Sequence, residues 1–285
     1  MKPNRYANRL PASSVEAMEI RGKVALVTGA GSGMGRELTL QLSSRGTHVA
    51  ALDMRLESLK ETAKLAQAHP GRVEIFEVDV TNSAVVATLP ARIEEELGKV
   101  DILINNAGII QPFKKVLDLS ESDIQKVMDV NFFGPLTLIK VFLPHLLDRP
   151  EAHILNVSSM GAYAPVPGQS VYGASKAAIK LLTEGLRSEL LDTRVGVTVV
   201  FPGAIATNIA ANSGITSIGS PENAKQAFPM TSAADAAKAM IEAIEKNKPR
   251  VVIGKDARML DIVSRINPVY AAKLIYKQMS GLLKG

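Results

Sequence analysis

Short apolar runs alternate with longer amphipathic segments along the 285-residue chain. The apolar runs resemble strands buried on both faces, and they predict strands at 24–28, 49–52, 73–78, 102–104, 154–157, 197–201 and 251–253. Segments with apolar positions three or four residues apart predict helices at 35–45, 56–68, 83–97, 123–147, 172–191 and 233–245. This alternation favours a parallel sheet with right-handed crossovers. The predicted fold class is α/β, a doubly wound parallel sheet of about seven strands with helices on both faces.

The strand pattern predicts three parts of the chain. Residues 1–22 precede the first strand and are expected to form a loose arm, and 23–254 form one nucleotide-binding and catalytic domain. Residues 255–285 form a helical extension, with helices at 257–265 and 269–282 divided by Pro268. The long connection at 208–230 is expected to act as a substrate lid.

Composition narrows the classes of protein. Hydrophobic residues make up 46% of the chain and charged residues 21%, which is a globular balance and excludes a disordered chain. The absence of cysteine excludes disulfides, thiolate metal ligands and a cysteine nucleophile, and the four histidines lack ligand spacing, so no metal site is expected. The first twenty residues lack the apolar core of a signal peptide, and a cytoplasmic location is expected.

Positive charge is concentrated at the end of the chain. The net charge is +5, and residues 246–285 carry nine Lys and Arg against Asp256 and Asp261. No basic stripe is interleaved with aromatic residues, so nucleic acid is not an expected partner. Three interpretations of the basic extension remain open: packing on its own domain or a neighbouring subunit, which is favoured, a lid over the substrate, or contact with an anionic membrane surface.

A glycine-rich turn follows the first predicted strand. The segment Thr28-Gly29-Ala30-Gly31-Ser32-Gly33-Met34-Gly35 leads into a helix. Glycines allow the backbone to approach a pyrophosphate, and the helix start offers free N–H groups to that anion. A plain glycine-rich turn is the alternative, but its place in the first strand–turn–helix unit favours nucleotide binding.

Asp53 ends the second predicted strand, where a carboxylate can bind the adenosine ribose hydroxyls. Its charge would repel the 2′-phosphate of NADP, and no basic residue stands at Ser32 or Met54 to offset this. Arg55 is close enough to weaken the argument. The sequence therefore favours NAD over NADP, with a solvated strand-end aspartate as the alternative.

Tyr172 and Lys176 are four residues apart and share a face of a predicted helix. A cation beside a phenol lowers the pKa of the phenol, so this tyrosine is a candidate acid or base for an alcohol or carbonyl. Alone, the pair is common by chance. Ser159, after the fifth strand, adds a hydroxyl that can hold a substrate oxygen, and Asn131 can hold water or backbone groups.

Taken together and in order, these motifs resemble the short-chain dehydrogenase/reductase family in its one-domain Rossmann form. The resemblance covers about residues 21–254 and includes Asp79-Val80-Thr81, Asn105-Asn106-Ala107-Gly108 and the stretch from Pro202-Gly203 to Thr207. It implies that Tyr172 is the acid/base and that Ser159 polarises the substrate oxygen. It also implies that Lys176 binds the nicotinamide ribose and lowers the tyrosine pKa, and that Asn131 holds a water of the proton relay.

The resemblance also implies a nicotinamide cofactor. Asp79 and Val80 would flank its adenine, Asn106 would lie by the adenine ribose, and Ile205 and Thr207 by the carboxamide. The full set of expected cofactor-binding residues is Gly29, Ser32, Gly33, Met34, Gly35, Asp53, Asp79, Val80, Asn106, Tyr172, Lys176, Ile205 and Thr207.

The expected activity is hydride transfer between NAD(P) and a secondary alcohol or ketone. The small, apolar residues after Thr207 favour a hydrophobic substrate. The resemblance implies a homotetramer or homodimer assembled through the helices at 123–147 and 172–191. Two alternatives remain: an epimerase or dehydratase of the same fold, whose usual glycine spacing differs, and a non-catalytic NAD-binding regulator, which the complete set of Ser159, Tyr172 and Lys176 disfavours.

Overall fold

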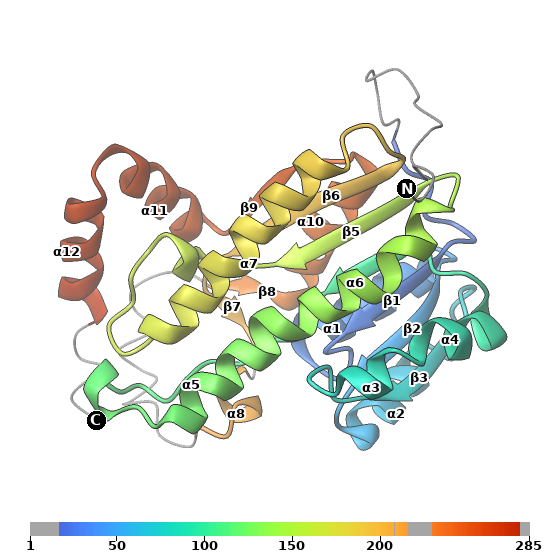
Figure 1. The fold of residues 1–285 in the computed structure, drawn as a ribbon, viewed down its shortest axis with the longest axis horizontal. Coiled ribbons are helices and arrows are strands. Elements are labelled where there is room, and N and C mark those ends of the chain that lie inside the picture. Colours follow the sequence, from blue (N-terminus) through green and yellow to red (C-terminus); the bar gives the residue numbers. More distant parts are fainter. Residues whose placement is uncertain (1–16, 208, 216–229, 280–285) are drawn as a thin grey trace, which may run out of the picture.

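The computed structural model describes residues 17–207, 209–215 and 230–279. All seven predicted strands form, and they pair in parallel in one sheet of order β3-β2-β1-β4-β5-β6-β9 (Figure 1). The strands of this sheet are β1 (Val24–Thr28), β2 (His48–Asp53), β3 (Val73–Glu77), β4 (Ile102–Asn105), β5 (Ala152–Val157), β6 (Val195–Pro202) and β9 (Arg250–Ile253). A separate short pair joins β7 (Ile205–Ala206) to β8 (Thr231–Ser232). The predicted fold class is confirmed.

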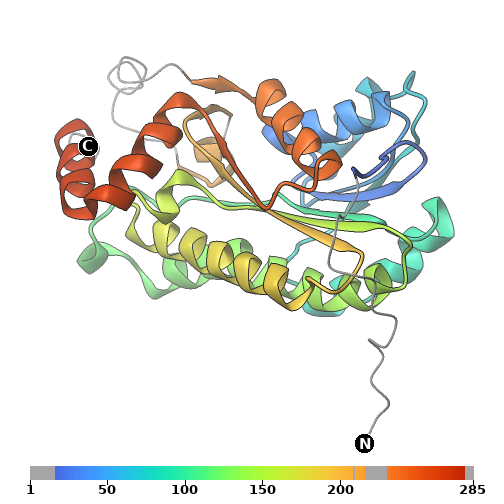
Figure 2. The same ribbon diagram turned by 90° about the horizontal axis from the view of Figure 1, so that it is seen from above.

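Helices cover both faces of the sheet, which Figure 2 shows edge-on. On one face lie α1 (Gly33–Ser44), α2 (Leu56–Leu65) and α10 (Ala233–Glu245). On the other lie α3 (Ser83–Val86), α4 (Leu89–Leu97), α6 (Gly134–Leu147) and α7 (Ser170–Glu189). The remaining helical elements are η1 (Val116–Asp118), α5 (Glu121–Met128), η2 (Asp129–Phe133), η3 (Met160–Ala162), α8 (Ile209–Asn212), α11 (Lys255–Ile266) and α12 (Pro268–Met279).

Strand β1 shows why the apolar runs are continuous. Val24 and Leu26 belong to the hydrophobic cluster on the α4–α6–α7 side, whereas Ala25 and Val27 belong to the cluster on the α1–α10 side. Successive strand residues point to opposite faces, so a strand covered on both faces has no polar alternation. The strand order reverses between β1 and β4, and in such sheets ligands bind beyond the carboxyl ends at this reversal.

Two predicted helices are interrupted, and a proline explains each interruption. The helix predicted at 83–97 is two helices, α3 and α4, because Pro90 has no N–H to donate to the carbonyl of Val86, four residues earlier, where α3 ends. The helix predicted at 123–147 contains a π-helical turn, Asp129–Phe133, between α5 and α6. Pro135 has no N–H, so the backbone carbonyl of Asn131, four residues earlier, lacks its usual helical donor.

The end of the arm predicted at 1–22 is packed, not loose. Met18 and Ile20 are buried in the α1–α10 cluster. The backbone N–H of Met18 donates to the carbonyl of Glu245, and the Thr47 hydroxyl donates to the carbonyl of Ile20. Residues 1–16 lie outside the described residues, as does most of the predicted lid at 208–230.

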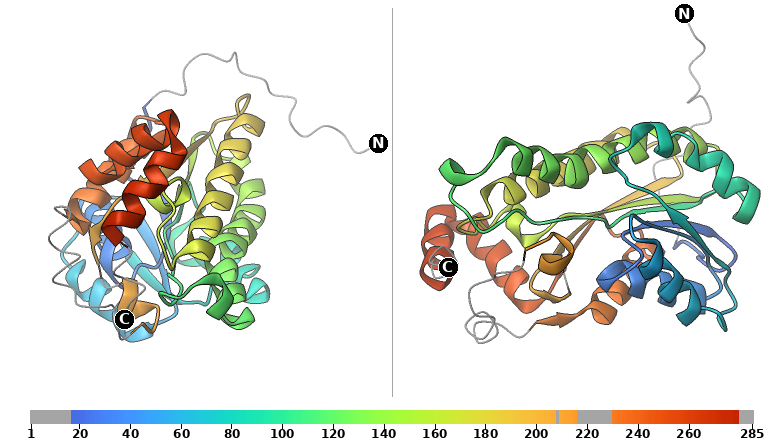
Figure 3. Two further views of the ribbon diagram at one scale, coloured as in Figure 1. Left: turned by 90° about the vertical axis from the view of Figure 1, so that its left-hand side faces the viewer. Right: turned by 90° about the horizontal axis from the view of Figure 1, so that it is seen from below.

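The C-terminal extension forms two packed helices, α11 and α12, divided at Pro268 as predicted. Leu260 and Ile275 are buried against Ala164 in the segment after η3. Seen from the side in the left part of Figure 3, the two helices stand outermost at this end of the molecule.

One helical stretch, Glu121–Leu147, is long and apolar enough to cross a membrane by length and composition alone. Its Leu138, Ile139, Phe142 and Leu146 are buried in the core on the α4–α6–α7 side. The core helix of a protein that does not cross a membrane packs in the same way and has the same length and composition. The stretch is therefore only weak evidence for a membrane span.

Candidate active site

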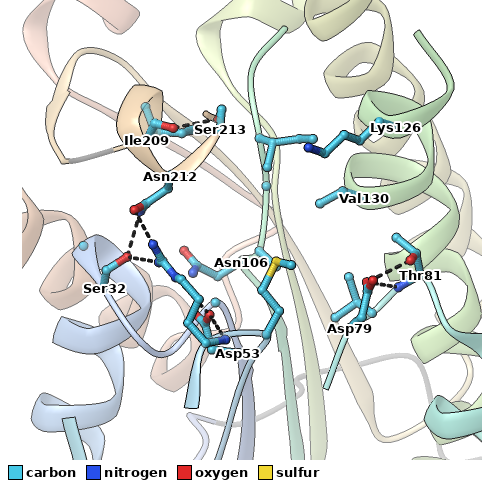
Figure 4. Close-up of a pocket in the computed structure, with 18 of the residues that line it drawn as sticks. Ser32, Asp53, Asp79, Thr81, Asn106, Lys126, Val130, Ile209, Asn212 and Ser213 are labelled. Atoms are coloured by element: carbon cyan, nitrogen blue, oxygen red, sulfur yellow. Dashed lines mark hydrogen bonds and ion pairs between the residues drawn. The ribbon is translucent and has the colours of Figure 1, made fainter. Parts of the chain in front are cut away.

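A cleft of about 780 Å³ opens at the carboxyl ends of β1, β2 and β4 (Figure 4). It brings together most of the predicted cofactor-binding residues: Gly29, Ser32, Gly33, Met34, Asp53, Asp79, Val80, Asn106 and Thr207. Two cations also line it, Arg55 and Lys126, and Lys126 reaches in from α5 on the opposite wall. Sequence reasoning missed Lys126, which no motif marks.

The glycine-rich turn leaves the start of α1 open toward this cleft. Ser32 caps the helix by its backbone only, since its side chain makes no capping hydrogen bond. Gly29 and Gly33 adopt positive φ angles of 69° and 52°, which disfavour other residues. A Cβ at Gly35 would collide with the backbone of Gly29, so the close turn requires glycine there. The unpaired N–H groups and the helix dipole make this a site for an anion such as a pyrophosphate.

Asp53 is buried at the end of β2 and is held by backbone groups. One carboxylate oxygen accepts the Gly31 N–H at 3.0 Å, and the other accepts the Arg55 N–H at 3.0 Å. The Arg55 guanidinium lies 3.6 Å from the second oxygen and donates to the Asn212 side chain at 2.6 Å and to Ser32 at 3.3 Å. Arg55 therefore bridges the glycine-rich turn and α8 across the cleft.

Asn106 is fixed by Thr28, which lies at the end of β1. Its amide donates to the Thr28 carbonyl at 2.9 Å, and the backbone N–H groups of Asn106 and Ala107 donate to the Thr28 hydroxyl. The side-chain oxygen of Asn106 is buried and has no partner among the described residues. Asp79 lies on the opposite wall of the cleft. One of its carboxylate oxygens accepts hydrogen bonds from the backbone N–H and the hydroxyl of Thr81 (Figure 4).

These features fit a dinucleotide. The open helix start, the glycine cradle and the unpartnered Asn106 oxygen all face or border the same cleft. Such a group needs an anion site for its phosphates and polar groups for its riboses, and the cleft offers both.

Lys176 and Asn131 meet at Gly108, beside the cleft. A Cβ at Gly108 would lie 3.1 Å from the lysine nitrogen and 3.2 Å from the Asn131 side-chain oxygen. The ammonium is buried and donates to the Val157 carbonyl at 3.0 Å. Burial lowers the pKa of Lys176 to about 8. This group still carries most of its charge at neutral pH.

Ser159 and Tyr172 converge at Gly161. A Cβ there would lie 3.3 Å from a Tyr172 ring carbon and 3.4 Å from the Ser159 hydroxyl oxygen. The lysine nitrogen lies 5.9 Å from the centre of the Tyr172 ring. The sequence predicts a lowered tyrosine pKa, but in this structure burial raises the pKa of Tyr172, and the Ser159 hydroxyl acts in the opposite direction. Burial therefore opposes the effect that the sequence predicts for Lys176.

The Asn131 side chain holds neighbouring chain segments. Its oxygen accepts the Ile109 N–H at 2.9 Å, and its amide donates to the Ile109 carbonyl and to the Ser175 hydroxyl. Both amide hydrogens are used. The expected water of the relay would therefore need another atom of this residue, such as the backbone carbonyl, whose usual helical donor is missing at Pro135.

Gln111 positions the first turn of α7, a role that no sequence motif predicts. The side chain is buried, and its oxygen accepts the N–H groups of Val171 at 2.8 Å and Tyr172 at 2.9 Å. Its amide donates to the Gly168 carbonyl, and its own carbonyl accepts from Gln169. The backbone at Tyr172 is thus fixed by a residue 61 positions earlier in the chain.

Asp256, in the first turn of α11, fixes the loop after β6 in the same way. Its buried carboxylate accepts the Ala204 N–H at 2.6 Å, and a Cβ at Gly203 or Gly254 would collide with it. This loop leads into β7, where Ile205 is half-buried, and on to Thr207 at the cleft. A helix-start aspartate is a recognisable signal, but its partner cannot be read from the sequence.

Tyr163, between η3 and Ala164, joins the segment after Ser159 to α11. Its hydroxyl donates to the Ala257 carbonyl at 3.0 Å. Burial raises the pKa of this tyrosine, and the charge of the nearby Asp261 adds to the effect. The extension is therefore tied to two loops of the site, through Tyr163 and through Asp256.

Comparison with known proteins identifies the family. Residues 23–217 match the model of the short chain dehydrogenase family. An oxidoreductase named SadH from Mycobacterium tuberculosis is 37% identical over 252 residues, which cover 86% of this chain and 91% of that protein. The chain is a member of the short-chain dehydrogenase/reductase family, and the resemblance seen in the sequence is confirmed.

Solved structures support the same conclusion. A short-chain dehydrogenase/reductase from Burkholderia phymatum in complex with NAD superposes with a TM-score of 0.78 at 28% identity, covering 87% of this chain and 93% of that one. A short chain dehydrogenase from Burkholderia cenocepacia in complex with NADP gives 0.73 at 30% identity, covering 92% and 99%. Family members therefore bind a nicotinamide cofactor, and the two neighbours differ in which one they hold.

Proposed function

We propose that the protein transfers a hydride between NAD(P) and a secondary alcohol or ketone, with Tyr172 as the proton donor or acceptor. The observation that carries the proposal is the convergence of Tyr172 and Ser159 at Gly161, with Lys176 reaching the neighbouring Gly108. Lys176 reaches Gly108, which lines the cleft that fits a dinucleotide. The bound cofactor would supply the hydride donor or acceptor.

The residues of the chain then handle the proton. The Ser159 hydroxyl binds the substrate oxygen and stabilises charge that develops on it, and Tyr172 gives or takes the proton at that oxygen. The Lys176 ammonium binds the nicotinamide ribose and favours the phenolate. Water at the backbone carbonyl of Asn131 connects Lys176 to solvent, since the Asn131 side chain is used elsewhere.

NAD is the proposed cofactor. The carboxylate of Asp53 lies where the adenosine ribose is expected, and its charge repels a 2′-phosphate. The positive charge of Arg55 would instead attract a 2′-phosphate. Its guanidinium, however, already binds Asn212 and Ser32 and lies near Asp53 itself. The α1 start would hold the pyrophosphate, and Ile205 and Thr207 the carboxamide.

The proposed substrate is small and hydrophobic. The segment after Ser159 contributes Met160, Ala164 and Val166 to an apolar cluster with the extension, which supports an apolar pocket wall. We keep a cytoplasmic location as part of the proposal, together with the division into an arm, a catalytic domain and an extension.

A homodimer or homotetramer is the proposed assembly. On α7, Leu181 is 68% exposed, and beside it a shallow hollow is lined by Phe132, Ala177, Ala178 and Leu182. Exposed apolar side chains on long helices support contact with a second copy. Light scattering that shows a monomer at micromolar concentration would count against this.

Tyr172→Phe tests the chemistry. The ring remains, so the dissociation constant for the cofactor should change little, while kcat should fall about 10²- to 10⁴-fold because the titrating proton is lost. The assay follows absorbance of the reduced nicotinamide with a panel of apolar alcohols and ketones and both cofactors. Unchanged kcat would overturn the assignment. If the wild type binds the cofactor but turns over no substrate, the non-catalytic regulator is favoured. If it inverts a stereocentre of a substrate without a net change in absorbance, an epimerase is favoured.

A further inference from the structure

We propose that the outer face of the α11–α12 hairpin binds the surface of an anionic lipid membrane. The outer hairpin face is defined here by six exposed apolar side chains: Met259, Ile262, Ile266, Val269, Tyr270 and Tyr276. Ile266 is 79% exposed and Val269 64%, on either side of the bend at Pro268. The proposal concerns binding alone, so it stands or falls separately from the proposed reaction.

The hairpin has two distinct apolar faces. On the inner face, Ala257, Leu260, Ala271 and Ile275 are buried, which fixes the hairpin to the body of the protein. Interior packing also accounts for the partly buried Leu274 and Met279. The six residues of the outer hairpin face are a second apolar set, exposed on both helices, and exposed apolar sets of this size mark binding surfaces.

Residues of the outer hairpin face share faces of their helices. Met259, Ile262 and Ile266 are spaced three and four apart on α11. On α12, Val269 and Tyr276 lie on one face with Lys273 between them. Tyrosines and long apolar side chains beside lysines are the composition of helices that lie in a membrane interface.

The exposed charge on the hairpin is positive. Five cations are exposed: Lys255, Arg258, Arg265, Lys273 and Lys277. Neither helix has an exposed acidic residue, because Asp256 is buried and Asp261 is held by Arg250 and Arg265. A surface that combines apolar side chains with cations complements a lipid surface with anionic headgroups.

The same charge disfavours a second copy as the occupant. Two-fold symmetric contact places the same patch of both subunits face to face. Lys273 and Lys277 would then approach their own counterparts with no exposed carboxylate on the hairpin to offset the repulsion. An anionic membrane satisfies the apolar side chains and the cations together.

The hairpin also lies at the active-site end of the molecule. Strand β5 points toward the side on which α11 and α12 stand (Figure 1). Leu260 and Ile275 pack against the segment after Ser159, and Tyr163 bonds to Ala257. Docking through the outer hairpin face would therefore hold this end of the site near the membrane, from which an apolar substrate could enter.

The test measures co-sedimentation of the full chain with vesicles of phosphatidylcholine containing phosphatidylserine, and with vesicles of phosphatidylcholine alone. We expect binding to the anionic vesicles at low salt and at least a tenfold weaker partition at high salt or without phosphatidylserine. The double variant Lys273→Glu/Lys277→Glu should reduce the partition at least tenfold, since it reverses two charges. The matched control is Lys60→Glu/Lys64→Glu, which reverses two exposed charges on α2, at the opposite end of the molecule, and should bind as the wild type does (Figure 1).

The apolar contribution is tested by Ile262→Ser/Ile266→Ser, which should also weaken binding, against Leu65→Ser/Leu191→Ser as the control, at two exposed apolar side chains outside the hairpin. Thermal unfolding verifies that each variant folds. Three results would overturn the proposal: no binding to anionic vesicles at low salt, equal binding to neutral vesicles, or wild-type binding by both hairpin variants. If the hairpin variants instead convert an oligomer to a monomer and leave vesicle binding unchanged, the outer face is a contact between subunits.

Discussion

The two ends of the candidate site are held in different ways. At the proposed adenosine end, the two carboxylates are held by groups close in sequence: Asp53 by Gly31 and Arg55, 22 and 2 positions away, and Asp79 by Thr81, 2 positions away. At the proposed nicotinamide end, Gln111 fixes the backbone of Tyr172 from 61 positions away, and Asp256 fixes Ala204 from 52. The carboxylates of the first end are thus held locally, although Thr28 holds Asn106 there from 78 positions away, whereas the second end depends on contacts between distant parts of the chain.

This difference shows where tolerance to substitution should lie. The adenosine end depends on backbone geometry that a short glycine-rich motif encodes by itself. The nicotinamide end depends on single buried side chains, and removing one leaves a buried backbone group without its partner, at a cost of about 1–3 kcal/mol. Among the residues that position the site, we therefore expect a larger loss of rate from those at the nicotinamide end than from those at the adenosine end.

Among the residues that position the site, the largest effect is expected for Gln111→Leu. The N–H groups of Val171 and Tyr172 lose their acceptor, so the start of α7 shifts and kcat should fall about 10- to 100-fold. Gln111→Glu keeps the acceptor but adds a negative charge, which raises the pKa of Tyr172 further. Its pH–rate profile should move to higher pH, whereas a merely structural role would leave the profile in place. Gln41→Leu, which removes a hydrogen bond from a half-buried side chain on α1 to the Ala234 carbonyl, serves as the control.

Asp256→Ala should have the next largest effect. The loop from Gly203 to Thr207 loses the acceptor that holds Ala204, so KM for the cofactor should rise about tenfold with a smaller change in kcat. Steady-state kinetics separate the two constants. Asp192→Ala, at an exposed residue after α7, should change neither, and a wild-type KM in the Asp256 variant would show that the extension does not organise this loop.

At the adenosine end, Asp53→Asn should change selectivity more than rate. The amide retains an oxygen acceptor while the charge is lost, so the ratio of kcat/KM with NADP to that with NAD should rise about tenfold, equivalent to about 1.4 kcal/mol. The measurement compares both cofactors in wild type and variant. A wild type that already favours NADP tenfold would mean that Arg55 governs the choice.

The smallest effect on the candidate site is expected for substitution of His153, which lies near the start of β5 and away from both ends of the site. Burial, followed by the charge of Arg187, lowers the pKa of His153 to about 3. Between pH 3 and pH 6.5 this histidine is protonated in the unfolded chain but neutral in the folded protein. The free energy of unfolding therefore keeps its full value above pH 6.5 and decreases as the pH falls toward 3.

For this histidine the loss is about 1.4 kcal/mol per pH unit, or about 2 kcal/mol between pH 7 and pH 5. Urea unfolding at the two pH values measures it, and His153→Gln should remove that share of the dependence. Cofactor affinity at pH 7 should stay as in the wild type. An equal pH dependence in both proteins would show that other groups carry the acid sensitivity.

The sequence predicts the strands of the sheet and the residues that line the adenosine end of the cleft, because both depend on patterns among residues that are close in the chain. Apolar runs identify strands buried on both faces, and the glycine-rich turn with Asp53 is a local pattern. The interruption at Pro90 and the π-helical turn before Pro135 were missed, because the apolar spacing continues through both. Gln111 and Asp256 could not be predicted, since their partners are set by the fold and not by neighbours in the chain.

The packed segment Ala17–Gly22 has a practical consequence for shortening the protein or joining it to another. The first strand begins at Val24, so a cut at residue 23 would look safe from the strand pattern. It would remove Met18 and Ile20 from beneath α10 and expose apolar surface there, at about 1.5–3 kcal/mol for each side chain. A fusion joined before Ala17 keeps both anchors and leaves the carboxyl-end cleft, on the far edge of the sheet, untouched.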